Sequence, residues 1–328
     1  MSRVGGLFAG ALALAMSLTV VTPAQAASHT GPALKLSPAV LAKALTCPNG
    51  LRHPQRQVVL LVHGTGVNGD ESWPHGLGPV LAAAGFDWCM VNIPDYELGD
   101  AQTNTEFVVA AVRAIHRQTG RQVSLIGHSQ GAMESRWAVR WWPDVRAAVD
   151  HVVTVEGANI GTRSGNLGCE FGRCTAASWQ YSMHSHFIEA LNKDPMPAGP
   201  IYTAIGSITD LALNPSGALG DQPYFIPGNG AGNVLVQDKC PTKFVDHVEA
   251  IFDSAEIGIV LDALSHPGQV DLARVDPSVC GQVYAAGIDP AAATHDIAVM
   301  YSRALPRIFS PLSPYWTDAE PALRPYAR

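Results

Sequence analysis

The chain has 328 residues, of which 47% are hydrophobic and only 15% are charged. This length suits one large α/β domain or two small ones, and the apolar content is enough for a full core. The formal net charge of −7 is modest and argues against a nucleic-acid partner.

The N-terminal segment has the pattern of a secretory signal peptide. Arg3 precedes an apolar stretch over Leu7–Val21, and Ala24-Gln25-Ala26 follows it. This order of a basic residue, an apolar region and a small-x-small site predicts a signal peptide over residues 1–26, cut after Ala26. The stretch is short for a membrane span. We therefore expect a secreted protein without a transmembrane segment, whose catalytic domain covers residues 27–328 and acts as a monomer.

The cysteines support export from the cell. The chain contains Cys47, Cys89, Cys169, Cys174, Cys240 and Cys280. An even number in an exported chain predicts three disulfides, although the sequence alone allows about fifteen pairings. The Cys-x-x-Cys pairs of a zinc site are missing, so we expect no bound metal.

Strand and helix patterns alternate along the rest of the chain. Val58–Val62 is fully apolar and rich in valine, which is typical of a buried parallel strand. Thr103 with Glu106 indicates a capping box for a helix that ends at Gly120. The other predicted elements are helices over 79–84, 132–142 and 289–303, and strands over 88–93, 123–126, 149–155, 201–205 and 234–236.

This alternation predicts an α/β fold with a mostly parallel central sheet flanked by helices. Residues 159–200 show no clear period and contain Cys169, Cys174 and Trp179. We expect them to form a small cap-like insertion over the carboxyl edge of the sheet, where ligands bind in such folds. A plain surface excursion is the alternative.

One motif points to a specific chemistry. The apolar strand before Gly127 leads into Gly127-His128-Ser129-Gln130-Gly131 and then into a helical pattern. This is the nucleophile elbow of an α/β-hydrolase, in which a sharp turn lifts a serine above the sheet edge. The alternative is an ordinary strand–turn–helix with a capping serine. The upstream His63-Gly64-Thr65-Gly66 is glycine-rich like a phosphate loop, but it lacks the Gly-Lys-Ser/Thr ending.

A nucleophilic serine needs a histidine base and a carboxylate that orients this base. In α/β-hydrolases the chain order is serine, acid, histidine. His247 is the leading candidate for the base, with His266 and His295 behind it. Asp210 follows the predicted strand over 201–205 and leads for the acid. Its competitors are Asp221 and Asp246.

The oxyanion that forms during attack needs preorganised N–H donors. Gln130, the residue after the nucleophile, supplies one of them. Thr65, in the loop after the first strand, should supply the second, and its hydroxyl a third. This chemistry requires no cofactor.

The chain resembles the secreted α/β-hydrolase lipases of the Candida antarctica lipase B type. The segments that carry this resemblance are Gly64-Thr65-Gly66, Asn104-Thr105-Glu106, Ser129-Gln130-Gly131, Ser178-Trp179-Gln180, Thr209-Asp210, Cys240, Asp246-His247 and Pro325-Tyr326-Ala327-Arg328. They occur in order over nearly the whole mature chain. The resemblance implies Ser129, Asp210 and His247 as the triad and Thr65 with Gln130 as the oxyanion hole.

The same resemblance implies the disulfides Cys47–Cys89 and Cys240–Cys280, which leaves Cys169–Cys174 as a local bridge. It also directs attention to a substrate pocket formed by His128, Asn159, Trp179 and Gln180. His128 stands where the yeast enzyme has a tryptophan, and Asn159 stands where an acidic residue is suggested. These departures leave the triad intact and affect the expected substrate preference.

The residues therefore predict a secreted carboxylic ester hydrolase of the triacylglycerol lipase type that forms an acyl-enzyme. Its partner would be an ester or lipid, in solution or at an oil–water interface. A polyester depolymerase or an acyltransferase could use the same triad. A hydrolase fold that only binds is the alternative from another class, but an intact Ser, Asp and His in order argues against it.

Overall fold

The computed structural model describes residue 1 and residues 30–53, 55–214 and 222–328. The predicted signal peptide and the candidate acid Asp221 lie outside the described residues. Among the residues described, no helix has both the length and the apolar character needed to cross a membrane.

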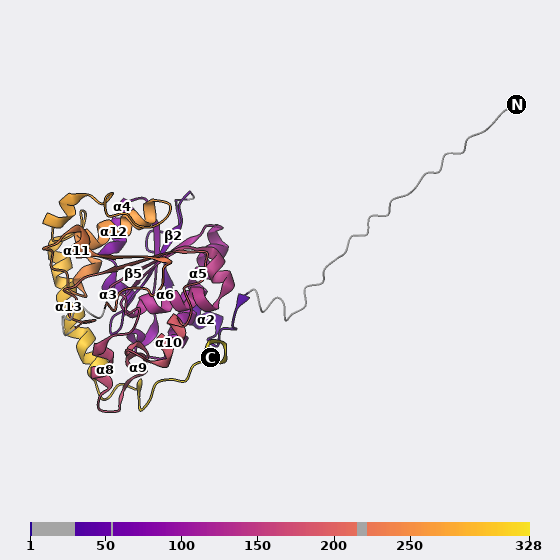
Figure 1. Cartoon of the computed structure of the whole chain (residues 1–328), viewed down its shortest axis with the longest axis vertical. Coiled ribbons are helices and arrows are strands. Elements are labelled where there is room, and N and C mark those ends of the chain that lie inside the picture. The colour runs from indigo at the N-terminus through magenta and orange to yellow at the C-terminus, as the bar shows by residue number, and fades with distance from the viewer. Residues whose placement is uncertain (2–29, 54, 215–221) are drawn as a thin grey trace.

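A seven-stranded sheet forms the centre of the molecule, in the order β1-β3-β2-β4-β5-β7-β8 (Figure 1). The strands are β1 Leu45–Thr46, β2 Val58–Val62, β3 Asp87–Val91, β4 Val123–His128, β5 Val149–Val155, β7 Ile201–Gly206 and β8 Ala231–Leu235. Only β1 is antiparallel to its neighbour, and the other neighbouring pairs are parallel. The predicted mostly parallel sheet is therefore confirmed.

Helices cover both faces of this sheet. They are α2 Pro38–Ala42, α3 Gly69–Ser72, α4 Leu77–Ala83, α5 Ala101–Thr119, α6 Gln130–Trp141, α7 Pro143–Ala148, α8 Arg163–Cys169, α9 Ala176–Tyr181, α10 His186–Asn192, α11 Val236–Lys239, α12 Ser254–Ser265 and α13 Pro290–Phe309. Short 3₁₀ turns lie at Pro94–Glu97, Glu249–Ile251, Pro277–Gly281 and Pro325–Ala327. A small antiparallel sheet pairs β6 Cys174–Thr175 with β9 Trp316–Thr317.

The core is divided in two by the central sheet, because successive side chains of a strand point to opposite faces. Val58, Leu60 and Val62 pack with the apolar faces of α5, α6 and α7. Val59 and Leu61 pack with α4, α12 and α13 on the other side. β2 is therefore apolar at every position because both of its faces are covered.

Three disulfides join the pairs that the resemblance implies: Cys47–Cys89, Cys169–Cys174 and Cys240–Cys280. The first ties the chain beside β1 to β3, and the third ties the end of α11 to a 3₁₀ turn. The second closes a loop between α8 and β6. These elements belong to the segment 159–200, which also carries α9 and α10.

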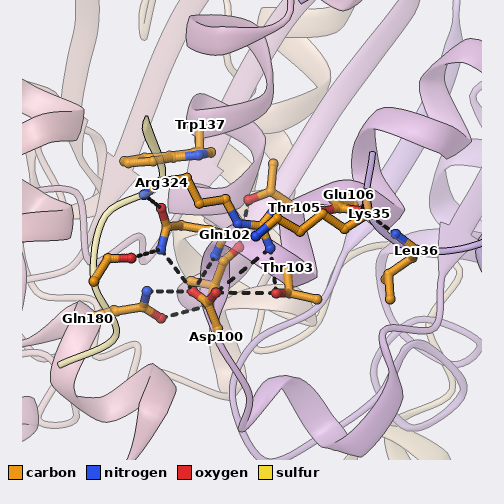
Figure 2. A network of polar contacts seen from close by, with 12 residues as sticks. Lys35, Leu36, Asp100, Gln102, Thr103, Thr105, Glu106, Trp137, Gln180 and Arg324 are labelled. Carbon is orange, nitrogen blue, oxygen red and sulfur yellow. Dashed lines mark hydrogen bonds and ion pairs between the residues drawn. The ribbon is translucent and has the colours of Figure 1, made fainter. Parts of the chain in front are cut away.

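The start of α5 differs from the predicted capping box. Asp100 is the N-cap, and its carboxylate accepts from the backbone N–H of Gln102 at 3.0 Å. Glu106 instead accepts from the backbone N–H groups of Lys35 and Leu36 and pairs with Arg324. Figure 2 shows this side chain turned away from the helix terminus. A long-range ion pair has replaced the local cap that the sequence pattern indicated.

Helix α13 is longer than predicted. It continues past Arg303 to Phe309, although Pro306 lies inside it. In Figure 1 it runs along one flank of the molecule towards α8, and a Cβ on Gly168 would lie 3.6 Å from the Phe309 ring. The final turns of α13 therefore reach the segment 159–200 and can contribute to a pocket between them.

Candidate active site

Ser129 lies at the sharp turn between the central strand β4 and helix α6. Its backbone has φ 56° and ψ −123°, a conformation that costs energy for a residue with a side chain. The backbone N–H of Ser129 donates to the Val155 carbonyl at 3.0 Å, which fixes the turn against β5. Ser129 therefore emerges at the carboxyl edge of the sheet, at the N-terminus of α6.

The two glycines of the motif are required by close backbone contacts. A Cβ on Gly127 would lie 2.4 Å from the Gly131 carbonyl oxygen, and one on Gly131 would lie 2.3 Å from that of His63. Atoms at such distances overlap, so only glycine fits at either position. The spacing of the motif follows from a turn that folds back on itself beside β2.

His247 and Asp210 complete a hydrogen-bonded chain with Ser129. His247 Nε2 lies 2.8 Å from Ser129 Oγ, and His247 Nδ1 lies 2.7 Å from Asp210 Oδ2. Asp210 Oδ1 accepts from the backbone N–H of Leu213 at 2.9 Å. Asp210 is fully buried, whereas 13% of the His247 side chain is exposed. The structure thus brings together the three residues that the sequence pattern selected.

The charges in this chain are mutually stabilised. Burial acts to lower the pKa of His247, but Asp210, Asp246 and Glu249 outweigh it, so that the net shift is upward. Burial acts to raise the pKa of Asp210, but the charge and hydrogen bond of His247 hold it below its ordinary value. Asp210 is therefore ionised at neutral pH and can stabilise a protonated His247.

The competing candidates lie elsewhere. Asp246 accepts from the backbone N–H of Leu211 at 2.9 Å and from the hydroxyl of Tyr301 at 3.1 Å. His266 contacts Asp262, and His295 lies on the exposed side of α13. None of these three contacts Ser129.

Thr65 and Gln130 lie beside the nucleophile and contact each other. The Thr65 hydroxyl donates to Gln130 Oε1 at 2.5 Å. Within the described residues, no acceptor binds the backbone N–H of either residue. Both residues line the pocket in front of Ser129. Two N–H donors are thus free at this position, while the hydroxyl that we expected as a third donor already has an acceptor.

Two buried glutamates, Glu97 and Glu134, hold the side chain of Gln130 in place. Gln130 Nε2 donates to Glu134 Oε1 at 2.9 Å and to the Glu97 carbonyl at 3.0 Å. Burial raises the pKa of Glu134 to about 8, which leaves it protonated at neutral pH. Glu97 follows two other residues with positive φ, Asp95 and Tyr96, so this strained loop is held by the contact.

The pocket in front of Ser129 has a volume of about 220 Å³ and is mainly apolar. Its floor contains the nucleophile, Thr65, Gln130 and His247. Its walls are formed by Val67, His128, Ala158, Thr162, Ser164, Tyr181, Ala212, Leu213, Val248, Met300, Tyr301, Ala304, Leu305, Ile308 and Phe309. The sequence reasoning missed the wall from α13, whose apolar residues at intervals of three and four extend beyond the predicted end at Arg303.

His128 is the one expected pocket residue that lines this cavity. Its Nε2 donates to the His247 carbonyl at 2.8 Å, and the rings of His128 and His247 lie 4.8 Å apart. Burial, reinforced by the neighbouring His247, lowers the pKa of His128 to about 3. His128 is therefore neutral, and it holds the backbone that carries the base.

The other three expected pocket residues do not line it. Asn159 is fully buried and bonds to Thr154 and to the Tyr224 carbonyl. Trp179 donates to the Thr317 carbonyl, which ties α9 to β9. Gln180 accepts from the Ala101 backbone N–H. It also donates to Asp100, as Figure 2 shows. Trp179 and Gln180 thus join α9 to β9 and to the start of α5, whereas Asn159 joins β5 to the segment that carries Tyr224.

Comparisons with known proteins find lipases that are similar to this chain. Residues 105–257 match the family of class 2 lipases. Lipase B of Pseudozyma antarctica is 26% identical over 328 residues, covering 98% of this chain and 93% of the relative. The crystal structure of Aspergillus fumigatus lipase B superposes with a TM-score of 0.81 at 25% identity, over 91% of this chain and 74% of that one.

A lipase from Bacillus licheniformis, in its mature form, matches more distantly. It has a TM-score of 0.50 at 18% identity, over 62% of this chain and 91% of that one, which shows a shared fold. The chain is thus similar to class 2 lipases and to lipase B and has the α/β-hydrolase fold, and these similarities support a serine ester hydrolase.

Proposed function

We propose that the chain is a secreted carboxylic ester hydrolase of the triacylglycerol lipase type, with Ser129 as nucleophile, His247 as base and Asp210 as orienting acid. The observation that carries this proposal is the continuous hydrogen-bonded chain from Ser129 Oγ through His247 to Asp210, which opens on an apolar pocket. The proposed reaction uses side chains and backbone N–H groups of this chain together with water.

In the acylation step His247 Nε2 takes the proton from Ser129 Oγ as this oxygen attacks the ester carbonyl. Asp210 holds the Nδ1–H tautomer of His247 and stabilises the imidazolium that forms. The carbonyl oxygen becomes an oxyanion beside the backbone N–H groups of Thr65 and Gln130. His247 then returns the proton to the leaving alcohol, and an acyl-enzyme remains on Ser129.

Deacylation repeats these steps with water as the nucleophile. His247 activates the water, the same N–H groups bind the second oxyanion, and the carboxylic acid leaves Ser129. The free N–H groups beside the nucleophile support this role, because donors placed in advance lower the barrier most. The Thr65 hydroxyl must turn away from Gln130 Oε1 if it also donates to the oxyanion.

The substrate class follows from the pocket and from exposed apolar side chains. Apolar side chains dominate the walls and suit an acyl chain or another apolar group of an ester. Leu305 and Phe309 line the pocket and are about half exposed, and Leu167 in α8, Phe171 just after it and Leu312 just after α13 are exposed as well. Exposed apolar side chains of this kind fit contact with lipid at an oil–water interface. The segment 159–200 then acts as a small cap, since Thr162, Ser164 and Tyr181 reach the pocket.

Export of the chain is part of the proposal. The three disulfides suit an oxidising compartment, and the N-terminal pattern suits a cleaved signal peptide. N-terminal sequencing of protein from the culture medium should give a chain that starts at Ala27. Protein that stays in the cytoplasm with its N-terminus intact would contradict export.

Hydrolysis rates on p-nitrophenyl esters from acetate to palmitate, together with an emulsified triglyceride, test the function. We expect turnover of these esters and of the emulsion by the wild-type protein, and none above background by Ser129→Ala. A protein that is folded and inactive on all of them, or a Ser129→Ala variant that keeps its activity, would contradict the proposal.

A further inference from the structure

A buried glutamate that the proposed mechanism does not use lies directly behind the acid of the triad. Glu156 is the first residue after β5 and is fully buried. Its backbone N–H donates to the Ile205 carbonyl at 3.0 Å, so it stays paired with β7, whose following loop carries Asp210. Its φ of 43° lies in the left-handed region, which is unfavourable for a residue with a side chain. The fold therefore maintains a costly backbone conformation and a buried acid at one position.

The carboxyl of Glu156 lies between two other acids. It is in hydrogen-bond contact with Asp210 on one side and with Glu256, in the first turn of α12, on the other. Asp210 and Glu256 are also fully buried. Among the described residues, no N–H or O–H donor of another side chain or of the backbone reaches the Glu156 or Glu256 oxygens. Contact between two carboxyl groups is a hydrogen bond only if one of them carries a proton.

The position of the protons follows from the surrounding groups. Asp210 accepts from His247 Nδ1 and from the Leu213 backbone, which favours its ionised form. A second and a third buried negative charge in contact with it would be strongly unfavourable. Burial, together with the charges of Asp210 and Glu256, raises the pKa of Glu156 well above its ordinary value. Burial raises the pKa of Glu256 to about 8.

Within the described residues, the charge of Lys243 acts against this order at Glu256, but its ammonium group pairs with Asp253 at 3.0 Å. Tyr224 also faces Glu156, and burial raises the pKa of Tyr224 to about 12. Both glutamates are therefore neutral when Asp210 is ionised.

We propose that Glu156 is a positioning residue: a neutral carboxylic acid that donates its O–H to Asp210 and fixes the carboxylate with Oδ2 towards His247. Glu256 in turn donates to Glu156 and completes a three-acid chain behind the triad. A charge-assisted hydrogen bond of this kind is short and directional. It stabilises the Asp210 anion and holds it in place without adding charge to the site. This inference rests on the proposed function, because it acts through Asp210 and His247.

Two substitutions of Glu156 distinguish a role as hydrogen-bond donor from a role as negative charge. Glu156→Leu removes the donor, so we expect kcat to fall at least tenfold with KM within about threefold, as for a loss of transition-state stabilisation. The Asp210 carboxylate would then lose a donor that disperses its negative charge, so it would hold the proton on His247 more strongly. The acidic limb of the kcat/KM profile should therefore move to higher pH. Glu156→Gln keeps an N–H donor, so it should recover most of kcat and leave the acidic limb within about 0.3 pH unit of wild type.

An ionised Glu156 would give the opposite profile. Glu156→Gln would then remove a negative charge beside Asp210, and the acidic limb would move to lower pH by about one unit or more. That shift would overturn the proposal, as would a Glu156→Leu variant with wild-type kcat. Thr154→Val is the matched control on the preceding strand β5, because the buried Thr154 hydroxyl accepts from Asn159 Nδ2 at 2.9 Å and does not belong to the three-acid chain. It should change stability without moving the pH profile.

Infrared difference spectroscopy provides a readout that does not depend on activity or on a folded leucine variant. At neutral pH the spectrum of wild type minus Glu156→Gln should contain the carbonyl stretch of a protonated carboxyl. A difference confined to the carboxylate region would refute a neutral Glu156. If the protein hydrolyses no ester, the proposed function fails while this spectrum still reports on Glu156, so the two failures are distinguishable.

Discussion

Gly64 gives a sharp test of the catalytic geometry, because a single methyl group there would touch the nucleophile. A Cβ at this position would lie 2.6 Å from Ser129 Cβ, 3.2 Å from Ser129 Oγ and 3.3 Å from the His128 carbonyl. Ordinary contact begins at 3.4 Å, so Ser129 or the loop after β2 must move by about 0.8 Å. The residue's own φ is outside the left-handed region, so alanine brings a steric clash without a backbone penalty.

Gly64→Ala should therefore disturb the 2.8 Å contact between Ser129 Oγ and His247 Nε2. A misplacement of about 1 Å costs on the order of 10²-fold in rate. Overpacking should cost about 1–3 kcal/mol of stability. We expect kcat for p-nitrophenyl butyrate to fall about 10²-fold with a smaller change in KM, in a protein that still unfolds cooperatively.

Gly230→Ala is the matched control, since no atom of the described part of the chain, other than its immediate neighbours in sequence, lies within 4 Å of a Cβ at that position. It should leave kcat, KM and the melting temperature near their wild-type values. Wild-type kcat in a folded Gly64→Ala variant would refute the reasoning, because it would mean that the nucleophile tolerates displacement or that Ser129 is not the reacting group.

Four further predictions concern the site and its stability. Thr65→Val should lower kcat by on the order of 10²–10³ if its hydroxyl turns to the oxyanion, whereas an unchanged kcat would show that the backbone N–H groups suffice. The acidic limb of kcat/KM should have its midpoint above pH 6.5, because the net pKa shift of His247 is upward and the protonated ring cannot act as a base. A midpoint below pH 6.5 would contradict the ion pair of His247 with Asp210. Burial raises the pKa of Glu134 from 4.5 to about 8, so the stability that it contributes is complete below pH 4.5 and is lost as the pH rises through 8. Glu134→Gln should therefore reduce the fall in melting temperature between pH 4.5 and pH 8. An identical fall in the variant and the wild type would be evidence against a neutral Glu134. The disulfides with separations of 42 and 40 residues should each contribute about 4 kcal/mol and the local one, with a separation of 5, about 2 kcal/mol, which calorimetry of paired Cys→Ala variants can rank.

The parts of the fold with local signals could be predicted from the sequence. The valine-rich strand β2 and the turn around Ser129 depend on neighbouring residues, since burial on both faces and a glycine-flanked elbow leave a direct pattern. The order of acid and histidine after the nucleophile then placed Asp210 and His247 first among the candidates, with Asp221, Asp246, His266 and His295 as alternatives. In the structure His247 forms a hydrogen bond with Ser129, and Asp210 forms one with His247.

Features set by distant contacts could not be predicted in this way. Glu106 has the spacing of a capping box, but Arg324, far along the chain, takes its carboxylate. Gln180 and Asn159 were expected at the substrate, but the contacts that occupy their amides come from segments remote in sequence. A pattern within one segment cannot reveal which distant group will reach it.

The buried acids were the most informative omission. Glu156 stands directly after the mostly buried strand β5, at the same sheet edge as the nucleophile, and this placement was a usable signal. An ionisable residue at the buried end of such a strand is unusual enough to indicate a partner. Glu256, by contrast, resembles an ordinary first-turn acid of a helix, so only the structure relates it to Glu156.

Covalent labelling with a fluorophosphonate probe tests the central assignment most directly. A phosphonate reacts with a serine only when a base and an oxyanion site activate it, so the folded wild-type protein should take up one equivalent, and peptide mass spectrometry should place it on Ser129. Ser129→Ala should not be labelled. Wild-type protein that stays unlabelled while folded, or a label on another residue, would contradict the assignment of Ser129 as the nucleophile.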